Sequence, residues 1–483
     1  MKFYYKEPFL LNSENVHNDN CRKVNDKEID MKTLITSIPI CMSNDSRDFI
    51  SMRVAPTTAI YLLAAVALKE GIDIALLDPY EMQLEVGKHG LRETIKSKMD
   101  EFDVICLSSN TLNWSNTVKV IKEIRELYGK NKVIVLGGIH PTYFYEHIIN
   151  DLEVDYILRG EGEMSFPKFL KCLVNKSDLD CVEGLVRKKC EGTTTNQKVP
   201  IIDDETYKKL PLPEFDLMPK GVYNLLPVET SRGCKYNCAF CSVPHRNNWR
   251  AFDEKVVINR GTQIISKHID KVNTKQVFIT DDCLTADFER AGKIMDKLMK
   301  IDEEILFGVE TRATDWLKPN VDIGIRTFGS SQISRLQFGV ECGYNEGLKK
   351  ISKGLTVELL EGTVAILEKN NMLSRAYFSF IVGFPWETMD DCLNTVDFAA
   401  YLENRCGRLG CVNVNWLQIY PSNIWRDREK YVIVAEPDIF DDEMFIEDKY
   451  YELFHPTLSR SEHDYVVEQI NKYENIGIYL RNY

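Results

Sequence analysis

Short apolar runs alternate with helix-length segments along most of the chain, and this alternation constrains the fold more than any other feature. In the amino-terminal half, the strand-like runs are residues 34–39, 72–77, 103–108 and 132–136. Strands that alternate with helices in this way are typical of a parallel, doubly wound α/β sheet. We therefore predict a Rossmann-like domain over residues 34–173, preceded by a polar extension over residues 1–33.

The alternation resumes in the second half of the chain. Strand-like runs begin near residue 225 and recur at residues 277–280, 305–309, 335–340, 376–382 and 412–419. Six strands in a βα series predict a partial (β/α)6 barrel over residues 225–421, with catalytic groups at the carboxyl ends of the strands. Residues 174–224 contain four prolines and are interpreted as a linker with one hairpin. Residues 422–483 lack the repeat and are predicted to cap the barrel.

The charge of the chain argues against a nucleic-acid partner. The formal net charge is -13 and no long basic run occurs, whereas phosphate binding needs clustered Lys and Arg. The longest apolar run, residues 59–68, is far shorter than the ~20 residues that cross a bilayer, and residues 1–33 lack the apolar core of a signal peptide. We therefore predict a cytoplasmic protein without a membrane span, whose 14 cysteines remain thiols or metal ligands.

Three cysteines in one short segment point to the chemistry. Cys234, Cys238 and Cys241 follow the first barrel strand with CxxxCxxC spacing. Such a loop can wrap three thiolates around one soft metal centre, and thiolate-rich sites select iron-sulfur clusters or zinc. A [4Fe-4S] cluster held by three cysteines leaves one iron open, whereas a structural zinc site needs a fourth donor, for which His245 is the candidate. We favour the cluster, because the cysteines open a βα barrel and Phe240 precedes the third one.

The CxxxCxxC spacing with an aromatic residue before the third cysteine resembles the signature of the radical S-adenosylmethionine superfamily. The resemblance implies that Cys234, Cys238 and Cys241 hold a [4Fe-4S] cluster, whose open iron is chelated by the amino and carboxylate groups of S-adenosylmethionine. One electron from the cluster would then split a carbon-sulfur bond and give a 5′-deoxyadenosyl radical. The barrel-length pattern after the motif agrees with this family.

Later strand ends resemble positions at which this family holds its cofactor. Asp282 ends the second barrel strand, where relatives place polar groups near the methionine amine, although a plain turn explains the position equally well. Arg312 lies where many relatives carry an arginine that can pair with the methionine carboxylate. Glu341, with residues 353–354, resembles the GvEsg…KG segment of the family and is expected at the ribose hydroxyls. The other matches, interpreted as turns that shape the adenine pocket, are residues 381–388 and 418–421.

The amino-terminal sheet resembles the cobalamin-binding domain that precedes the barrel in one large class of this superfamily. Residues that carry this resemblance include Ser108, Thr111, Gly137, Gly138 and the GEGE run at residues 160–163. We expect the two adjacent glycines to let a flat macrocycle or a nucleotide tail approach the strand ends, because glycine lacks a Cβ. No DxHxxG motif occurs, so no histidine is expected to ligate cobalt from below, and His140 is interpreted as a hydrogen-bonding turn residue.

The resemblance also implies a reaction and its partners. With both cofactors present, we expect a cobalamin-dependent methyltransferase that acts on an unactivated carbon of a natural-product or modified-peptide precursor. The same fold also supports radical rearrangement, cyclisation or carbon-carbon coupling, with or without cobalamin, and a non-catalytic cobalamin or iron sensor is the most distant alternative. The expected partners are a small-molecule or peptide substrate and an external one-electron reductant such as flavodoxin or ferredoxin.

Two further features are interpreted without a role in the chemistry. The acidic run at residues 436–443 is expected to be a solvated face. The cysteines of the barrel outside the motif are interpreted as buried structural thiols, and they are Cys283, Cys342, Cys392, Cys406 and Cys411.

Overall fold

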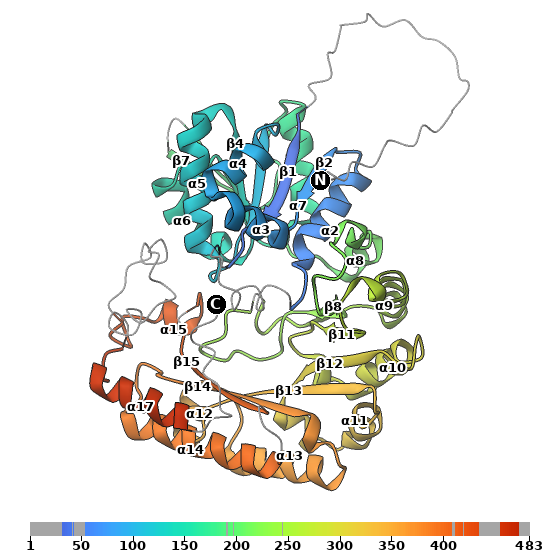
Figure 1. Ribbon diagram of the computed structural model, residues 1–483, viewed down its shortest axis with the longest axis vertical. Coiled ribbons are helices and arrows are strands. Elements are labelled where there is room, and N and C mark those ends of the chain that lie inside the picture. Colours follow the sequence, from blue (N-terminus) through green and yellow to red (C-terminus); the bar gives the residue numbers. More distant parts are fainter. Residues whose placement is uncertain are drawn as a thin grey trace, which may run out of the picture.

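The chain, seen here in a computed structural model, contains two largely parallel sheets with helices around them (Figure 1). The structure describes residues 31–40, 42, 54–189, 192–196, 198–243, 245–407, 411–418, 420–433 and 455–472. The predicted acidic run and most of the predicted polar extension lie outside the described residues. The α/β class with a first domain of Rossmann type and a second domain of half-barrel type is confirmed.

The first sheet follows the predicted doubly wound pattern, with strand order β2-β1-β3-β4-β5-β6-β7. Its parallel strands are β1 (Thr33–Ser37), β2 (Ile74–Leu77), β3 (Val104–Ser108), β4 (Val133–Gly137) and β5 (Tyr156–Leu158). Its helices are α2 (Thr58–Lys69), α3 (Pro79–His89), α4 (Leu91–Met99), α5 (Trp114–Tyr128), α6 (Ile139–Asp151) and α7 (Gly162–Val174). The carboxyl ends of these strands face the second domain, because Ser108, Gly137 and Leu158 line a cavity together with residues of that domain.

Two antiparallel strands extend this sheet where the sequence predicts a linker with one hairpin. β6 (Leu185–Lys189) pairs with β5, and β7 (Gly192–Thr195) pairs with β6. The hairpin is therefore present, but it belongs to the sheet, because the buried residues Leu185 and Val186 pair with the end of β5. The first sheet thus continues beyond the predicted boundary at residue 173.

Six parallel strands form the second sheet, as predicted, and their order β15-β14-β13-β12-β11-β8 follows the chain. The strands are β8 (Leu225–Val228), β11 (Gln276–Ile279), β12 (Leu306–Thr311), β13 (Ile333–Glu341), β14 (Ala376–Val382) and β15 (Val412–Trp416). Their helices are α9 (Glu254–His268), α10 (Phe288–Leu298), α11 (Val321–Phe328), α12 (Asn345–Lys350), α13 (Val357–Lys369) and α14 (Met389–Cys406). Within the described residues β8 and β15 do not pair, so the sheet is an open half-barrel.

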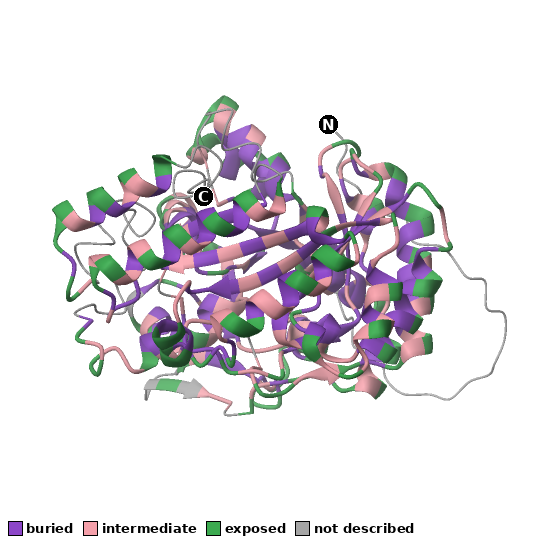
Figure 2. Cartoon of the chain, turned by 90° about the horizontal axis from the view of Figure 1, so that it is seen from below, coloured by how far each residue is buried: buried purple, intermediate pink, exposed green. Residues whose placement is uncertain are grey.

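The strands of the half-barrel present two different faces. In β14, every second residue from Ala376 to Val382 is buried, and the residues between them are half-buried. The buried row packs against α14, on which Cys392, Val396 and Ala399 are buried. Figure 2 shows this contrast between buried strand positions and the exposed outer sides of the helices. The less buried row therefore lies on the inner face of the half-barrel.

The residues between the two sheets form a packed connector rather than a loose linker. Tyr207 of α8 (Asp204–Lys209) stacks on Phe252, with ring centroids 3.7 Å apart. Arg260 of α9 donates hydrogen bonds to two carbonyls of the connector at 2.6 and 2.8 Å. The Tyr223 hydroxyl donates to Asp78 of the first domain at 2.8 Å. These contacts hold the two domains together at one side of their boundary.

After β15, two described helices lie near the edge of the half-barrel. α15 (Asn423–Arg426) contacts the loop that carries the three cysteines, because Ile424 N donates to Ala239 O at 3.0 Å. α17 (Arg460–Lys472) lies beside α14, and the ring centroid of His463 is 4.5 Å from that of Trp416. A cap formed by the whole segment 422–483 stays a prediction.

Candidate functional site

The three motif cysteines lie in the loop of a small hairpin that follows β8. β9 (Ser231–Arg232) pairs antiparallel with β10 (Arg250–Ala251), and the loop between them carries Cys234, Cys238 and Cys241. Gly233 opens this loop with φ of +74°, and a Cβ at this position would lie 2.4 Å from Asn248 O. The two sides of the loop can approach each other this closely only because glycine stands there. We call this loop, residues 233–249, the cluster loop.

A buried aspartate and a buried arginine anchor the cluster loop to the half-barrel. Asp281, which follows the end of β11, accepts hydrogen bonds from Thr230 N and Ser231 Oγ, both at 2.6 Å. Arg290 of α10 donates to Thr230 O and Phe252 O at 2.7 and 2.9 Å. Buried polar groups are costly to leave unpaired, so these contacts fix both strands of the hairpin stem.

Positively charged side chains surround the cysteines. Arg312, one residue beyond β12, places Nη1 3.8 Å from Cys238 Sγ, and its guanidinium lies 3.8 Å from the ring centroid of Tyr236. The buried Lys353 has Nζ 5.7 Å from the ring centroid of Phe240, inside the same loop. Thiolates are stabilised by nearby cations. Three cysteines with positive charge around them fit a [4Fe-4S] cluster that keeps one iron open to another ligand.

The histidine expected as the fourth donor of a zinc site has a partner in the first domain. His245, the expected fourth donor, has Nε2 3.7 Å from Glu161 Oε1 in the first domain. Cys283, interpreted from the sequence as a structural thiol, is buried, and its hydrogen bond with Cys234 lowers the pKa of the Cys234 thiol. Burial raises the pKa of Cys241 to about 12, so metal binding has to deprotonate it.

Glu341 ends β13 in a conformation that non-glycine residues rarely adopt. Its φ is +80°, and the pairing of β13 with β14 shifts register between Gly339 and Glu341. The Glu341 carboxylate lies 2.8 Å from Lys353 Nζ, and both side chains are 9% exposed. A Cβ at Gly339 would lie 2.4 Å from Glu341 Oε1, so glycine makes room for this ion pair. Strained backbone of this kind is concentrated at functional sites, where the surroundings enforce it.

Asp282 has surroundings unlike those of its neighbour Asp281. Its side chain is exposed, whereas Asp281 is fully buried. The pKa of Asp282 is raised to about 7, because the surrounding protein displaces part of the water around its carboxyl group and because Glu310 and Cys234 add negative charge. A carboxyl group in such a position can accept a hydrogen bond or a positive charge from a ligand. The two acids thus have different roles: Asp281 anchors the cluster loop, whereas Asp282 can contact a ligand.

The inner face of the half-barrel carries polar side chains that the sequence analysis missed. Gln337 of β13 donates from Nε2 to Glu310 Oε1 of β12 at 3.3 Å. The Arg335 guanidinium lies 3.8 Å from the ring centroid of Tyr377 of β14. Burial, followed by the charge of Glu341, raises the pKa of Glu310. The signal that could have found them is the period of two, because they alternate with the fully buried residues of the same strands.

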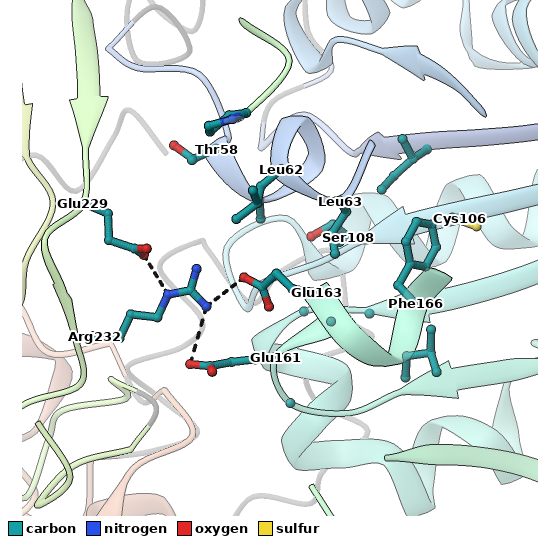
Figure 3. A pocket seen from close by; sticks show the side chains of 18 of the residues that line it. Thr58, Leu62, Leu63, Cys106, Ser108, Glu161, Glu163, Phe166, Glu229 and Arg232 are labelled. Carbon is teal, nitrogen blue, oxygen red and sulfur yellow. Dashed lines mark hydrogen bonds and ion pairs between the residues drawn. The ribbon is translucent and has the colours of Figure 1, made fainter. Parts of the chain in front are cut away.

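A cavity of about 320 Å³ opens at the carboxyl ends of the first sheet (Figure 3). Its walls come from both domains, because α2, α7 and the strand ends of the first sheet meet residues of β8 and α9 there. Four residues are predicted to contact cobalamin. Ser108, Gly137 and Gly138 line the cavity, whereas Thr111 does not. Its apolar lining includes Ile35, Leu62, Leu63, Leu136 and Phe166.

The cavity and its surroundings fit a large amphipathic cofactor such as cobalamin. Tyr143 and Met164 are 42% and 57% exposed and lie near the starts of α6 and α7, which follow strands of the first sheet. Large apolar side chains left uncovered are typical of a binding surface. Open α/β sheets bind ligands at this edge, so the residues of the apolar cavity would hold part of such a cofactor.

The two glycines at this edge differ in the atoms that surround them, and the approach of a macrocycle to them stays a prediction. Gly138 has φ of +100°, and a Cβ there would lie 2.3 Å from Ser109 O. Gly138 therefore allows two strand-end loops of the protein to pack against each other. At Gly137 a Cβ would meet only Leu158 O, at 3.7 Å, which is an ordinary contact. The close approach that requires glycine is thus one between protein loops.

His140 forms a hydrogen bond, as expected, but it lies in the first turn of α6 rather than in a turn before a helix. Its Nδ1 is 3.1 Å from Thr111 Oγ1, and its ring stacks on Trp114 with centroids 4.5 Å apart. Burial lowers the pKa of His140 well below its usual range. Because the ring is buried and does not line the cavity, His140 is not placed to ligate cobalt.

Ion pairs between the two domains lie at the mouth of the cavity (Figure 3). Arg232 of β9 has Nη1 2.7 Å from Glu163 Oε1 and Nε 2.8 Å from Glu229 Oε2. Arg250 of β10 donates to both carboxylate oxygens of Glu161, at 2.6 and 2.8 Å. The GEGE run thus contacts the stem of the cluster loop. No pattern in the sequence predicts a role for either arginine.

Two family models match the chain in the same order as the two domains. The model described as the B12 binding domain matches residues 53–170, and the model described as the radical SAM superfamily matches residues 228–399. The chain belongs to the cobalamin-binding class of the radical S-adenosylmethionine superfamily. The predicted cofactor set of a [4Fe-4S] cluster, S-adenosylmethionine and cobalamin is confirmed for this class. Which residues of this chain hold each cofactor stays a proposal.

Curated relatives of this radical SAM protein include enzymes of more than one reaction type. It is 26% identical over 309 residues to an uncharacterised methyltransferase of Pyrococcus horikoshii, in a match that covers 62% of this chain and 64% of the relative. It is 23% identical over 359 residues to the anaerobic magnesium-protoporphyrin IX monomethyl ester cyclase of Rubrivivax gelatinosus. This match covers 71% of this chain and 61% of the cyclase. The chain therefore spans less than two thirds of the length of these relatives.

Solved structures of the class have the same fold. The radical S-adenosylmethionine methyltransferase TsrM from Kitasatospora setae matches with a TM-score of 0.65 at 14% identity, over 92% of this chain and 88% of that protein. The cobalamin-dependent radical enzyme OxsB matches with a TM-score of 0.62 at 18% identity, over 92% of this chain and 62% of that protein. At these identities the likeness shows the fold. No helix in the described part of the chain is long and apolar enough to cross a membrane.

Proposed function

We propose that this protein is a cobalamin-dependent radical methyltransferase that acts on an unactivated carbon of a natural-product or modified-peptide precursor. The observation that carries the proposal is the shared boundary of the two candidate cofactor sites. Arg232 lines the cavity at the first sheet and stands two residues before Cys234, the first cysteine of the cluster loop. Relatives named as a methyltransferase and as a hopanoid C-3 methylase support this reaction type.

In this proposal, the half-barrel holds the cluster and S-adenosylmethionine. Cys234, Cys238 and Cys241 bind the cluster as thiolates, and the cations of Arg312 and Lys353 stabilise its negative charge. Glu341 accepts hydrogen bonds from ribose hydroxyls, Asp282 from the methionine amine, and Arg312 pairs with the methionine carboxylate. When bound, the cofactors supply a hydrogen-abstracting radical and a transferable methyl group, and an external one-electron reductant such as flavodoxin or ferredoxin supplies the electron.

The substrate lies between the inner face of the half-barrel and the strand ends of the first domain. Glu310 and Gln337 offer hydrogen bonds on one side of this space. Tyr143 stands on the other side, near enough to the cluster loop that Arg246 and Cys241 affect the pKa of its hydroxyl. Packing of both domains around the substrate excludes water, which protects a radical from side reactions. These residues hold and orient the substrate.

The test uses the full chain, reconstituted without oxygen with iron, sulfide and hydroxocobalamin. A strong reductant and S-adenosylmethionine labelled in its methyl group are added, and 5′-deoxyadenosine, S-adenosylhomocysteine and labelled methylcobalamin are measured. We expect all three products in the wild type. Cys238→Ala should release no 5′-deoxyadenosine, because the cluster loses a ligand. Cys181→Ser, which changes an exposed cysteine outside the cluster loop, is the matched control and should behave as the wild type.

Each other outcome selects a different function. 5′-Deoxyadenosine without methyl transfer to cobalamin would reject methylation and favour the rearrangement, cyclisation or coupling alternative, to which the cyclase relatives belong. No 5′-deoxyadenosine from a protein with an intact cluster would reject an enzyme and favour the sensor alternative. A protein that acquires no corrin absorption would reject the cobalamin assignment alone.

A further inference from the structure

The hairpin stem that carries the cluster loop is held from two sides. On the half-barrel side, Asp281 and Arg290 bind the backbone and hydroxyls of Thr230 and Ser231. On the other side, Arg232 and Arg250 bind carboxylates of the first domain. These two arginines are direct partners in the antiparallel register of β9 and β10. One pair of neighbouring side chains therefore connects the whole stem to the first domain.

The ion pairs are short and nearly buried. Arg250 offers its planar fork to both oxygens of Glu161, a geometry that fixes direction as well as distance. The side chains of Glu161 and Glu163 are 12% and 8% exposed, and those of Arg232 and Arg250 are 15% and 14% exposed. Burial alone would raise the pKa of Glu161, but the hydrogen bonds from Arg250 and the charge of Arg232 lower it. Glu161 is therefore ionised, and loss of Arg250 would remove the two short hydrogen bonds that hold its carboxylate.

Three of these four residues also form a wall of the cavity. Glu161, Glu163 and Arg232 line it, together with Gly160 and Gly162 of the GEGE run (Figure 3). Gly160 is packed tightly, because a Cβ there would lie 2.6 Å from Val199 Cγ1 and 2.8 Å from Pro200 O. A molecule in the cavity therefore contacts a tightly packed turn whose carboxylates determine the position of the arginines.

We propose that the ion pairs of Arg232 and Arg250 with Glu161 and Glu163 couple the two cofactor sites, so that occupancy of the cavity by cobalamin strengthens the hold of the cluster loop on its cluster. The four residues are positioning residues, because none of them binds the cluster iron. Coupling of this kind is reciprocal, so the cluster increases cobalamin affinity by the same factor. The inference rests on the proposed function, in that it takes cobalamin as the occupant of the cavity.

The test measures cobalamin binding by the full chain in two states. Hydroxocobalamin is titrated into cluster-free protein and into protein with a reconstituted cluster, without reductant or S-adenosylmethionine, and the two dissociation constants are compared. For the wild type we expect at least about fivefold tighter binding when the cluster is present, the lower end of typical coupling between sites. Loss of iron to a chelator should also be slower in the presence of cobalamin, although linkage fixes no factor for a rate.

The variants separate coupling from folding. Glu161→Gln and Arg250→Gln should each bring the ratio of the two constants to within about twofold of one, because either change removes the fork contact. Glu163→Gln provides a second route, since it removes a single contact with Arg232. Arg92→Gln, which breaks an ion pair with Glu123 inside the first domain, is the matched control and should keep the wild-type ratio. Thermal unfolding of each variant checks that it is folded.

The outcomes distinguish this inference from the proposed function. A wild-type ratio of one, with tight cobalamin binding in both states, would overturn the coupling and leave the function intact. Folded variants of Glu161, Arg250 and Glu163 that all keep the wild-type ratio would also overturn it. Absence of any cobalamin binding would overturn the cofactor assignment of the cavity and the coupling together.

Discussion

At the scale of single residues, two adjacent aspartates have opposite roles. Asp281 is buried and accepts hydrogen bonds that fix the stem of the cluster loop, whereas Asp282 is exposed. The sequence predicts a polar strand end here, but it does not predict which of the two aspartates is buried. Buried and open positions alternate only within a strand, and both aspartates lie after β11, which ends at Ile279. The ligand role of Asp282 therefore stays a prediction that a matched pair of variants can test.

Asp281→Ala should destabilise the protein, whereas Asp282→Ala should weaken only ligand binding. The first change leaves buried donors of Thr230 and Ser231 unpaired, and we expect the free energy of unfolding to fall by about 3 kcal/mol. The second change, at an exposed position, should alter that free energy by no more than ~0.5 kcal/mol. It should weaken S-adenosylmethionine binding about tenfold, or ~1.4 kcal/mol.

Urea unfolding measures the stability of both aspartate variants, and equilibrium dialysis of the cluster-loaded full chain measures S-adenosylmethionine affinity. If Asp282→Ala binds S-adenosylmethionine as tightly as the wild type, the plain turn is the correct interpretation of that position. If Asp281→Ala is as stable as the wild type, the anchoring role of Asp281 is wrong.

At the scale of elements, the sequence predicts the parallel strands well because their apolar runs are long and regularly spaced. It does not predict the hairpin of β9 and β10, because each strand has only two residues and no periodicity can be recognised over that length. It also places His140 in a turn, whereas α6 begins at Ile139. A proline in the first turn of a helix is favourable, so Pro141 was a signal for the helix rather than against it.

The glycine pair between β4 and α6 gives a prediction at this scale. Gly138→Ala should lower the free energy of unfolding by at least about 2 kcal/mol, because φ is +100° and the new Cβ would collide with Ser109 O. Gly137→Ala, the matched control, meets no such contact and should leave stability unchanged or raise it by less than ~1 kcal/mol. Chemical denaturation of both variants measures the difference. Equal stability of the two would show that the loops do not pack as described.

At the scale of the whole molecule, the boundary between the two domains is the part that sequence reasoning could not supply. Arg250 and Glu161 are 89 residues apart, and neither stands in a pattern that marks it as a partner of the other. The GEGE run was recognised as part of a family resemblance, without a contact to explain it. Only the packing of one domain on the other shows that these charges face each other. The cavity at this boundary likewise depends on both domains.

A larger side chain in this cavity should weaken cobalamin binding and leave the iron-sulfur cluster in place. Leu63 of α2 is half-buried and lines the cavity, so Leu63→Trp places an indole in the space that we assign to cobalamin. We expect the dissociation constant for hydroxocobalamin to rise at least about tenfold, or ~1.4 kcal/mol, while the free energy of unfolding changes by about 1 kcal/mol or less. Iron and sulfide content after reconstitution should stay at the wild-type level, because the cysteines of the cluster loop are unchanged.

Leu84→Trp is the matched control for this change, since Leu84 of α3 is also a half-buried helical leucine and does not line the cavity. It carries the same increase in size and any general cost of a larger side chain, so a difference between the two variants reports on the cavity alone. Titration followed by visible absorption gives the affinity of each, and chemical denaturation gives the stability. Wild-type cobalamin affinity in Leu63→Trp would mean that cobalamin binds elsewhere on the first sheet, and the assignment of the cavity would then be wrong.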